Sequence, residues 1–69
     1  MHVGANLDLE RAFERLTETS RAVVWLHDVE GYTHEEIAEQ MGKTVSFSKS
    51  QLARAHARLR GMLDEGAQA

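Results

Sequence analysis

The sequence has 69 residues, 42% of them hydrophobic, no cysteine and a formal net charge of −3. This length supports one small domain, and the lack of cysteine excludes disulfides and thiolate metal sites. No apolar run approaches the roughly 20 residues that cross a bilayer, and residues 1–5 lack the features of a signal peptide, so we expect a soluble cytoplasmic protein.

The negative net charge does not exclude a nucleic-acid partner, because the charges are separated along the chain. Residues 1–42 contain nine acids and three bases, residues 43–60 contain five bases and no acid, and residues 61–69 contain two acids. A polyanion responds to the potential within about a Debye length, roughly 8 to 10 Å. The basic segment can therefore bind DNA although the whole chain is acidic.

The N-terminal part predicts one short helix after an irregular start. Residues 1–5 are small and unpatterned, and we expect them to be disordered. Asn6 can cap a helix over residues 7–16. Its apolar contacts would come from Leu7, Leu9, Phe13 and Leu16.

A second helix is predicted over residues 19–30, after a run of capping residues at 17–20. It is apolar on more than half of its surface, as the central helix of a small bundle must be. We expect Trp25 to lie in the core, which is the usual place of a tryptophan, and not to serve as a platform for a ligand.

The third predicted helix, over residues 34–41, has a clear start and end. Thr33 and Glu36 have the spacing of a capping box, in which the hydroxyl and the carboxylate each bind a free backbone amide. Gly42 ends the helix because glycine adopts positive φ at little cost. The apolar stripe is narrow and consists of Ile37, Ala38 and Met41.

The fourth predicted helix is the longest, over residues 45–63, with Thr44 as its capping candidate. One stripe carries Ser48, Leu52, Ala55, Leu59 and Met62 or Leu63. The opposite arc carries Ser46, Ser50, Ala53, Arg54 and Ala57, with Lys49, Arg58 and Arg60 on its flanks. A helix with small residues along its centre and cations at its borders can lie deep in a DNA major groove.

Together these elements predict an all-α, four-helix domain over residues 6–63, containing a helix-turn-helix with a long C-terminal recognition helix, followed by a disordered tail at 64–69. We expect Ser48 to be buried, with its hydroxyl on the carbonyl of Thr44, and Phe47 to pack at the border of the core. The predicted core is Phe13, Leu16, Val23, Leu26, Ile37, Ala38, Met41, Leu52, Ala55 and Leu59.

The sequence shows no pattern of an enzyme, a metal site or a cofactor site. No two of its four histidines have the i, i+4 spacing of a helical metal pair. We interpret His34 and the glutamates that follow it as solvated residues that compensate a helix dipole. The five glycines form no phosphate-binding loop.

Two blocks, DVEGYTHEEIA and KSQLARAHARLR, resemble region 4 of bacterial sigma factors of the extracytoplasmic-function group, a similarity that covers residues 16–63. The resemblance implies a helix-turn-helix unit that reads the −35 promoter element and contacts the β flap of the RNA polymerase core. It also implies an anti-sigma factor as a partner. Region 2 of a sigma factor has no counterpart here, so we expect an excised domain or a natural fragment.

The resemblance assigns roles to individual residues. The base-reading positions of the family fall on Ser50, Ala53 and Arg54, which the helical wheel also places on the exposed arc. The positions that contact the DNA backbone are Lys49, Gln51, Arg58 and the amides from Thr44 to Ser46.

Four positions depart from the family pattern. Thr17 stands where proline is common, Lys43 where an aliphatic residue is usual, and Ser48 where valine or a similar residue is usual. Gln51 replaces an arginine, which removes one cation from the phosphate contacts.

Two other interpretations remain open. The output domain of a response regulator has a similar first helix of the motif, although its recognition helix does not usually continue as ARAHARLR. A module that acts mainly by docking a protein, such as an anti-sigma factor, is also compatible with the apolar and basic surfaces.

Overall fold

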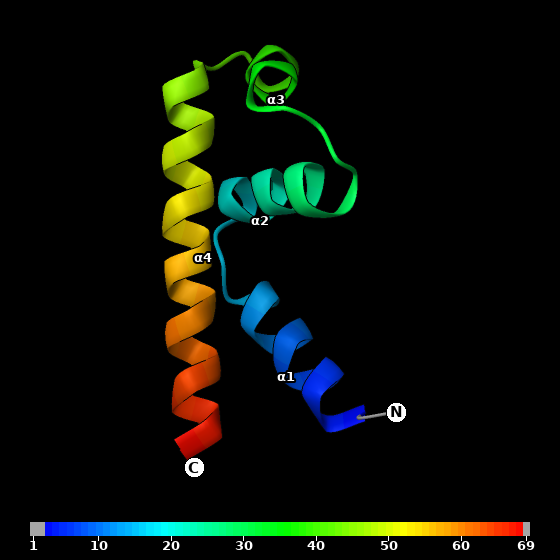
Figure 1. Ribbon diagram of the computed structural model, residues 1–69, viewed down its shortest axis with the longest axis vertical. Helices are drawn as coiled ribbons and strands as arrows, with labels where there is room; N and C mark the ends of the chain where they lie inside the picture. Colours follow the sequence, from blue (N-terminus) through cyan, green and yellow to red (C-terminus); the bar gives the residue numbers. More distant parts are fainter. Residues whose placement is uncertain (1–2, 69) are drawn as a thin grey trace.

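A computed structural model describes residues 3–68, and the side chains of residues 9–64. Its elements are α1 (Val3–Glu14), α2 (Glu18–Val24), the π-helical segment η1 (Trp25–Val29), α3 (His34–Met41) and α4 (Val45–Gln68). The described residues contain no strand, and the predicted all-α helix-turn-helix domain is confirmed. Figure 1 shows that α4 runs the full length of the molecule.

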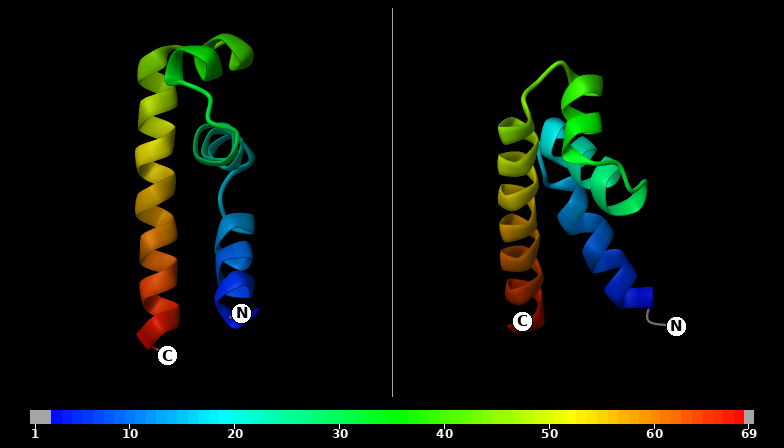
Figure 2. Two further views of the ribbon diagram at one scale, coloured as in Figure 1. Left: turned by 45° about the vertical axis from the view of Figure 1, so that its right-hand side comes forward. Right: turned by 45° about the horizontal axis from the view of Figure 1, so that its top comes forward.

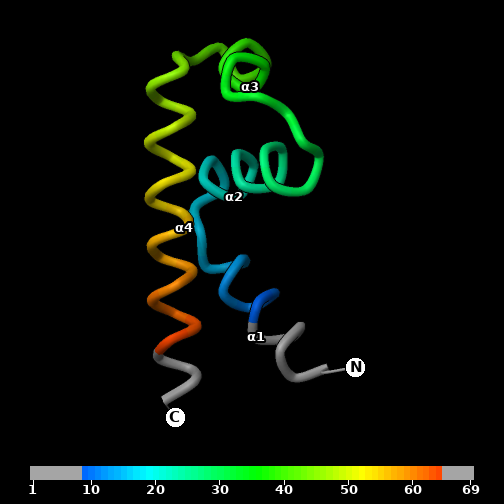
Figure 3. The backbone as a smooth tube through the Cα atoms, in the orientation of Figure 1, coloured from blue at the N-terminus to red at the C-terminus, as the bar shows by residue number. Residues whose placement is uncertain are grey.

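The three shorter helices all pack against α4. In Figures 1 and 2, α1 lies along the C-terminal half of α4, α2 crosses its middle, and α3 lies near its start. The tube in Figure 3 shows that α2 and η1 form one continuous helical run before the chain turns into α3. Helix α4 is therefore the element that the other three helices share as a packing partner in the core.

The helix boundaries agree with the sequence best where a cap defines them. Helices α3 and α4 begin at the predicted residues, and Thr33 and Glu36 form the predicted capping box, with N···O distances of 3.1 and 2.9 Å. Gly42 closes α3 with φ of +65°, a conformation that other residues adopt only at a cost.

The other boundaries differ. Helix α1 ends at Glu14, before the predicted residue 16, because the amides of Arg15 and Leu16 bind carbonyls three residues back and tighten the last turn. Helix α4 continues to Gln68, beyond the predicted residue 63.

Helix α1 begins at Val3, before the predicted residue 7, so Asn6 lies within the helix and is not its cap. Residues 3–5 and 64–68 belong to helices, although disorder was expected there. Residues 1–2 and 69, and the side chains of 1–8 and 65–69, lie outside the described part, so the predicted disorder of residues 1–2 and 69 stays a prediction.

We expect Thr33→Ala to lower the free energy of unfolding by about 0.5–2 kcal/mol, because the amide of Glu36 loses the hydroxyl that caps it. Urea denaturation measures the change. Gln40→Ala, at an exposed site of the same helix, is the control and should change stability by less than about 0.5 kcal/mol. Equal effects of the two substitutions would contradict the role of the cap.

The core is close to the predicted one. Leu16, Val23, Ile37, Ala38, Leu52 and Ala55 are buried, as predicted. The other predicted members are only partly buried and pack around the cluster: Phe13, Leu26, Met41 and Leu59. Ala12 and Val24 are buried although the predicted core did not include them.

The predicted burial of Trp25 is wrong, because 48% of this residue is exposed. Val23 and Val24 already fill the face of α2 that meets α4, and Trp25 begins the π-helical segment on the outer side. Its ring lies 6.4 Å from that of Phe13, and its indole N–H donates to Glu30 Oε2 at 3.2 Å. The tryptophan is thus part of the surface.

Candidate nucleic-acid interface

Helix α4 separates into a buried stripe and an exposed arc. Ser48, Leu52 and Ala55 are buried, and Leu59 is half-buried. The residues of the opposite arc are all exposed: Ser46, Ser50, Ala53, Arg54 and Ala57. The flanking cations Lys49, Arg58 and Arg60 are exposed as well. The burial pattern therefore agrees with the wheel drawn from the sequence.

The start of α4 is held at the turn after α3. The Thr44 hydroxyl accepts a hydrogen bond from the amide of Phe47 at 3.0 Å and caps the helix, as the sequence suggested. Thr44 and Ser46 are both exposed. A helix N-terminus carries a partial positive charge and free amides, so this end can receive a phosphate group.

Phe47 lies at the border between the core and the arc. It is half-buried, and the ammonium group of Lys43 lies 5.4 Å from the centre of its ring. This geometry fits a cation–π contact. The contact holds the positive charge of Lys43 beside the turn between α3 and α4.

Gln51 does not point freely from the helix. It is half-buried, and its Oε1 accepts a hydrogen bond from Ser20 Oγ at 2.8 Å. The carbonyl end of this side chain is therefore bound to α2, and the amide nitrogen is the group left for a phosphate contact. Ser20, 31 residues away in the sequence, was not expected to take part.

The partner of the Ser48 hydroxyl differs from the predicted one. Ser48 is fully buried, as expected, and its backbone amide binds the Thr44 carbonyl. Its hydroxyl, however, lies 2.8 Å from His34 Nδ1 and joins α4 to α3. The reason is that the first turn of α3 packs over Ser48, so an imidazole replaces the local carbonyl.

His34 itself is half-buried and not simply a solvated residue of an outer face. Its ring stacks on that of His27, with centres 4.7 Å apart and an angle of 19° between the planes. The sequence spacing gave no sign of this pair, because the two histidines lie on separate helices.

Asp28 joins His27 to a third histidine, His56. Its Oδ1 lies 2.9 Å from His27 Nδ1, and its Oδ2 lies 2.6 Å from His56 Nε2 on α4. Partial burial raises the pKa of the Asp28 carboxyl, but the hydrogen bonds and charges of the two histidines outweigh it and leave this pKa below the ordinary value. Ionised Asp28 therefore stabilises the fold above the unfolded pKa of about 3.9, and the contribution is lost as the pH falls through the lower folded value.

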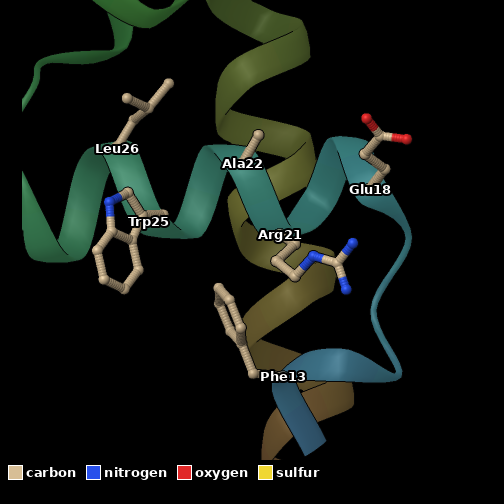
Figure 4. A pocket seen from close by; sticks show the side chains of 6 residues that line it. All are labelled: Phe13, Glu18, Arg21, Ala22, Trp25 and Leu26. Atoms are coloured by element: carbon tan, nitrogen blue, oxygen red, sulfur yellow. The ribbon is translucent and has the colours of Figure 1, made fainter. Parts of the chain in front are cut away.

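An apolar groove of about 340 Å³ opens between α1, η1 and α4. A second hollow, of about 410 Å³, lies between α1 and the helical run of α2 and η1, and Figure 4 shows Phe13 and Trp25 facing each other across it. Leu59 lines the groove, and at about 100° per residue it projects from the side of α4 opposite to Ala57. The groove is lined by Leu9, Glu10, Phe13, Val24, Trp25, Asp28, Val29 and Leu59.

Among the side chains that the structure describes, no group of three or more His, Cys, Asp or Glu residues could hold a metal ion. Within residues 3–68, no helix is both long and apolar enough to cross a membrane.

Residues 6–59 match the protein family described as Sigma-70, region 4. No solved structure matches the chain.

Proposed function

The chain belongs to the sigma-70 region 4 family, and on this premise we propose that it is the domain of an extracytoplasmic-function sigma factor that recognises the −35 promoter element. Region 4 domains of this family bind −35 promoter DNA and the RNA polymerase core. The observation that carries the proposal is the exposed arc of α4, which combines small residues with Arg54 and has the cations Lys49 and Arg58 on its flanks.

The residues of the arc divide by position into two roles. Ser50, Ala53 and Arg54 lie where a helix in the major groove meets the base edges. Lys49 and Arg58 lie on the flanks, toward the phosphates. The contacts of the turn come from Thr44 and Ser46, and the amide nitrogen of Gln51 adds one more.

The assignment to the extracytoplasmic-function group depends on the blocks DVEGYTHEEIA and KSQLARAHARLR. The competing assignment is a response-regulator output domain. The continuation of α4 as ARAHARLR, with its exposed cations, favours the sigma factor.

We also propose that the β flap of RNA polymerase docks in the groove between α1, η1 and α4. Leu9, Trp25 and Val29 are 50%, 48% and 58% exposed and line this same groove, and a contiguous exposed apolar patch marks a site of interaction. The groove lies on the side of α4 away from the DNA arc, so both partners could bind at once. An anti-sigma factor would act by covering one of these two surfaces.

The proposed setting is the cytoplasm, where promoter DNA and polymerase are found, and the domain would bind without catalysis or a cofactor. The alternative function, that of a module that acts mainly by docking proteins, is supported by the same exposed groove. Measured binding to promoter DNA distinguishes a DNA-recognition domain from a module that only docks proteins.

A mobility-shift assay with a −35 duplex and a scrambled duplex tests the proposal. We expect the chain alone to prefer the −35 duplex but to bind it weakly, with a Kd in the micromolar range or above, because one helix offers few contacts. With roughly four phosphate contacts, raising the salt from about 50 to 200 mM should weaken binding about a hundredfold. Attachment to polymerase would supply the missing affinity through effective concentration.

Equal, salt-insensitive binding to both duplexes would contradict the function in DNA recognition. Tight specific binding by the chain alone at physiological salt would instead show that it dimerises on DNA.

A further inference from the structure

Two side-chain contacts lie at the two borders of the buried stripe of α4. On one border, Gln51 Oε1 accepts from Ser20 Oγ at 2.8 Å. On the other, His56 Nε2 donates to Asp28 Oδ2 at 2.6 Å, since an ionised carboxylate can only accept. Both partners belong to the helical run of α2 and η1. We call these pairs, Ser20–Gln51 and Asp28–His56, the border contacts.

The border contacts are placed to resist rotation of α4 about its own axis. Gln51 and His56 project about 140° apart, with the buried Leu52 and Ala55 between them. Turning α4 in either direction would lengthen one contact and compress the other. Apolar burial is not directional, so Leu52 and Ala55 alone tolerate such a turn better than hydrogen bonds do.

Asp28 does not stabilise the helical run in which it lies, so its contact with His56 has another role. A carboxylate near the C-terminal end of a helical run opposes the helix dipole and destabilises the helix. What favours Asp28 there is its pair of imidazole partners, His27 and His56. Of these, His56 alone lies on α4, and the contact spans 28 residues of sequence.

Small rotations of α4 matter because Ala53 and Arg54 lie between the two anchored residues. A side-chain end about 6 Å from a helix axis moves by about 2 Å when the helix turns by roughly 20°. Hydrogen bonds to base edges tolerate far less than that, since donor–acceptor distances lie within about 2.7–3.2 Å.

We propose that Ser20 and Asp28 are positioning residues that fix the rotation of α4 and so determine which base pair Arg54 reads. The inference depends on the proposed function in −35 recognition. Neither residue lies on α4, so neither needs to touch DNA to change the preference.

The test measures preference and not affinity alone. Ser20→Ala, Asp28→Ala and the full chain without substitution are titrated against the −35 duplex and a set of duplexes that each carry one changed base pair. We expect the ratio of affinities at the base pair read by Arg54 to fall about two- to fivefold in each variant, which corresponds to the net strength of one hydrogen bond. Asp28→Asn keeps an oxygen that can accept from His56 and should retain most of the preference.

The ratio separates positioning from stability. Partial unfolding lowers the affinity for every duplex by the same factor, because only the folded fraction binds, and leaves the ratio unchanged. Glu30→Ala is the matched control: it removes a neighbouring carboxylate that binds Trp25 and not α4. It should raise the affinity for all duplexes slightly without changing the ratio.

If Asp28→Ala does not fold, His56→Leu removes the same contact from the side of α4, and His56→Gln retains a donor at a similar reach. A chain without substitutions that shows no preference for the −35 duplex would overturn the proposed function, and this inference with it. A preference that survives in Ser20→Ala and Asp28→Ala would overturn the inference alone. The inference would also be overturned if Asp28→Asn lost as much of the base-pair preference as Asp28→Ala does.

Discussion

Arg54→Ala should lower the affinity for the −35 duplex by about 1–3 kcal/mol and relax the preference at a single base pair. Arg54 is exposed on the arc, and the small residues Ser50 and Ala53 of the same arc let the backbone of α4 approach the bases. A guanidinium in this position can bind O6 and N7 of a guanine with two parallel hydrogen bonds. Titrations of a −35 duplex and its single-base variants give both quantities.

The matched controls are Lys49→Ala and Arg58→Ala, which remove exposed cations from the flanks of the same helix. Each should weaken binding to all sequences alike and reduce the salt slope by about one unit, because one fewer counterion is released. The division of roles would be wrong if Arg54→Ala weakened all duplexes equally while Lys49→Ala abolished the preference.

Ile37→Ala should lower the free energy of unfolding by about 2–5 kcal/mol. Ile37 is fully buried where α3 meets the rest of the core, and no other fully buried side chain among the described residues is larger. A domain of 69 residues has a total stability of only about 3–10 kcal/mol. The substitution should therefore leave a large unfolded fraction near 37 °C.

Val29→Ala is the control for Ile37→Ala, because Val29 is also β-branched but 58% exposed, and its truncation should change stability by less than about 0.5 kcal/mol. Urea or thermal denaturation followed by circular dichroism measures both variants. A loss below about 1 kcal/mol for Ile37→Ala would show that α3 is not part of the cooperative core.

Binding experiments connect the two results. At a temperature where Ile37→Ala is half unfolded, its apparent affinity should fall by about a factor of two for every duplex, with the preference intact. Arg54→Ala should show the reverse pattern, with normal stability and a lost preference. The domain thus offers one substitution for the fold and one for the recognition of DNA.

The sequence by itself determined the features that rest on local interactions. The capping box of Thr33 and Glu36 and the left-handed Gly42 join residues at most a few positions apart, so their residue types were enough to define α3. The division of α4 into a buried stripe and an exposed arc follows from the period of one helix. The family could be identified because its motifs lie in this same stretch.

The tertiary structure decided the features that depend on how the helices pack against one another, such as the exposure of Trp25 and the partner of the Ser48 hydroxyl. Trp25 was expected in the core because tryptophan usually lies there, but Val23 and Val24 occupy the side of the helical run that packs into the core, and Trp25 is left on the surface. The hydroxyl of Ser48 was expected to bind the local carbonyl of Thr44. It binds His34 instead, because α3 packs over Ser48.

The border contacts have the same origin. Ser20 and Asp28 meet Gln51 and His56 across 31 and 28 residues, at positions set by the packing of two helices. Local propensity carries no information on the crossing position or angle of two helices, which depend on how their side chains interdigitate. The sequence therefore defined the exposed arc of α4, the proposed DNA surface, and only the packing of α2 against α4 decided how that arc is held.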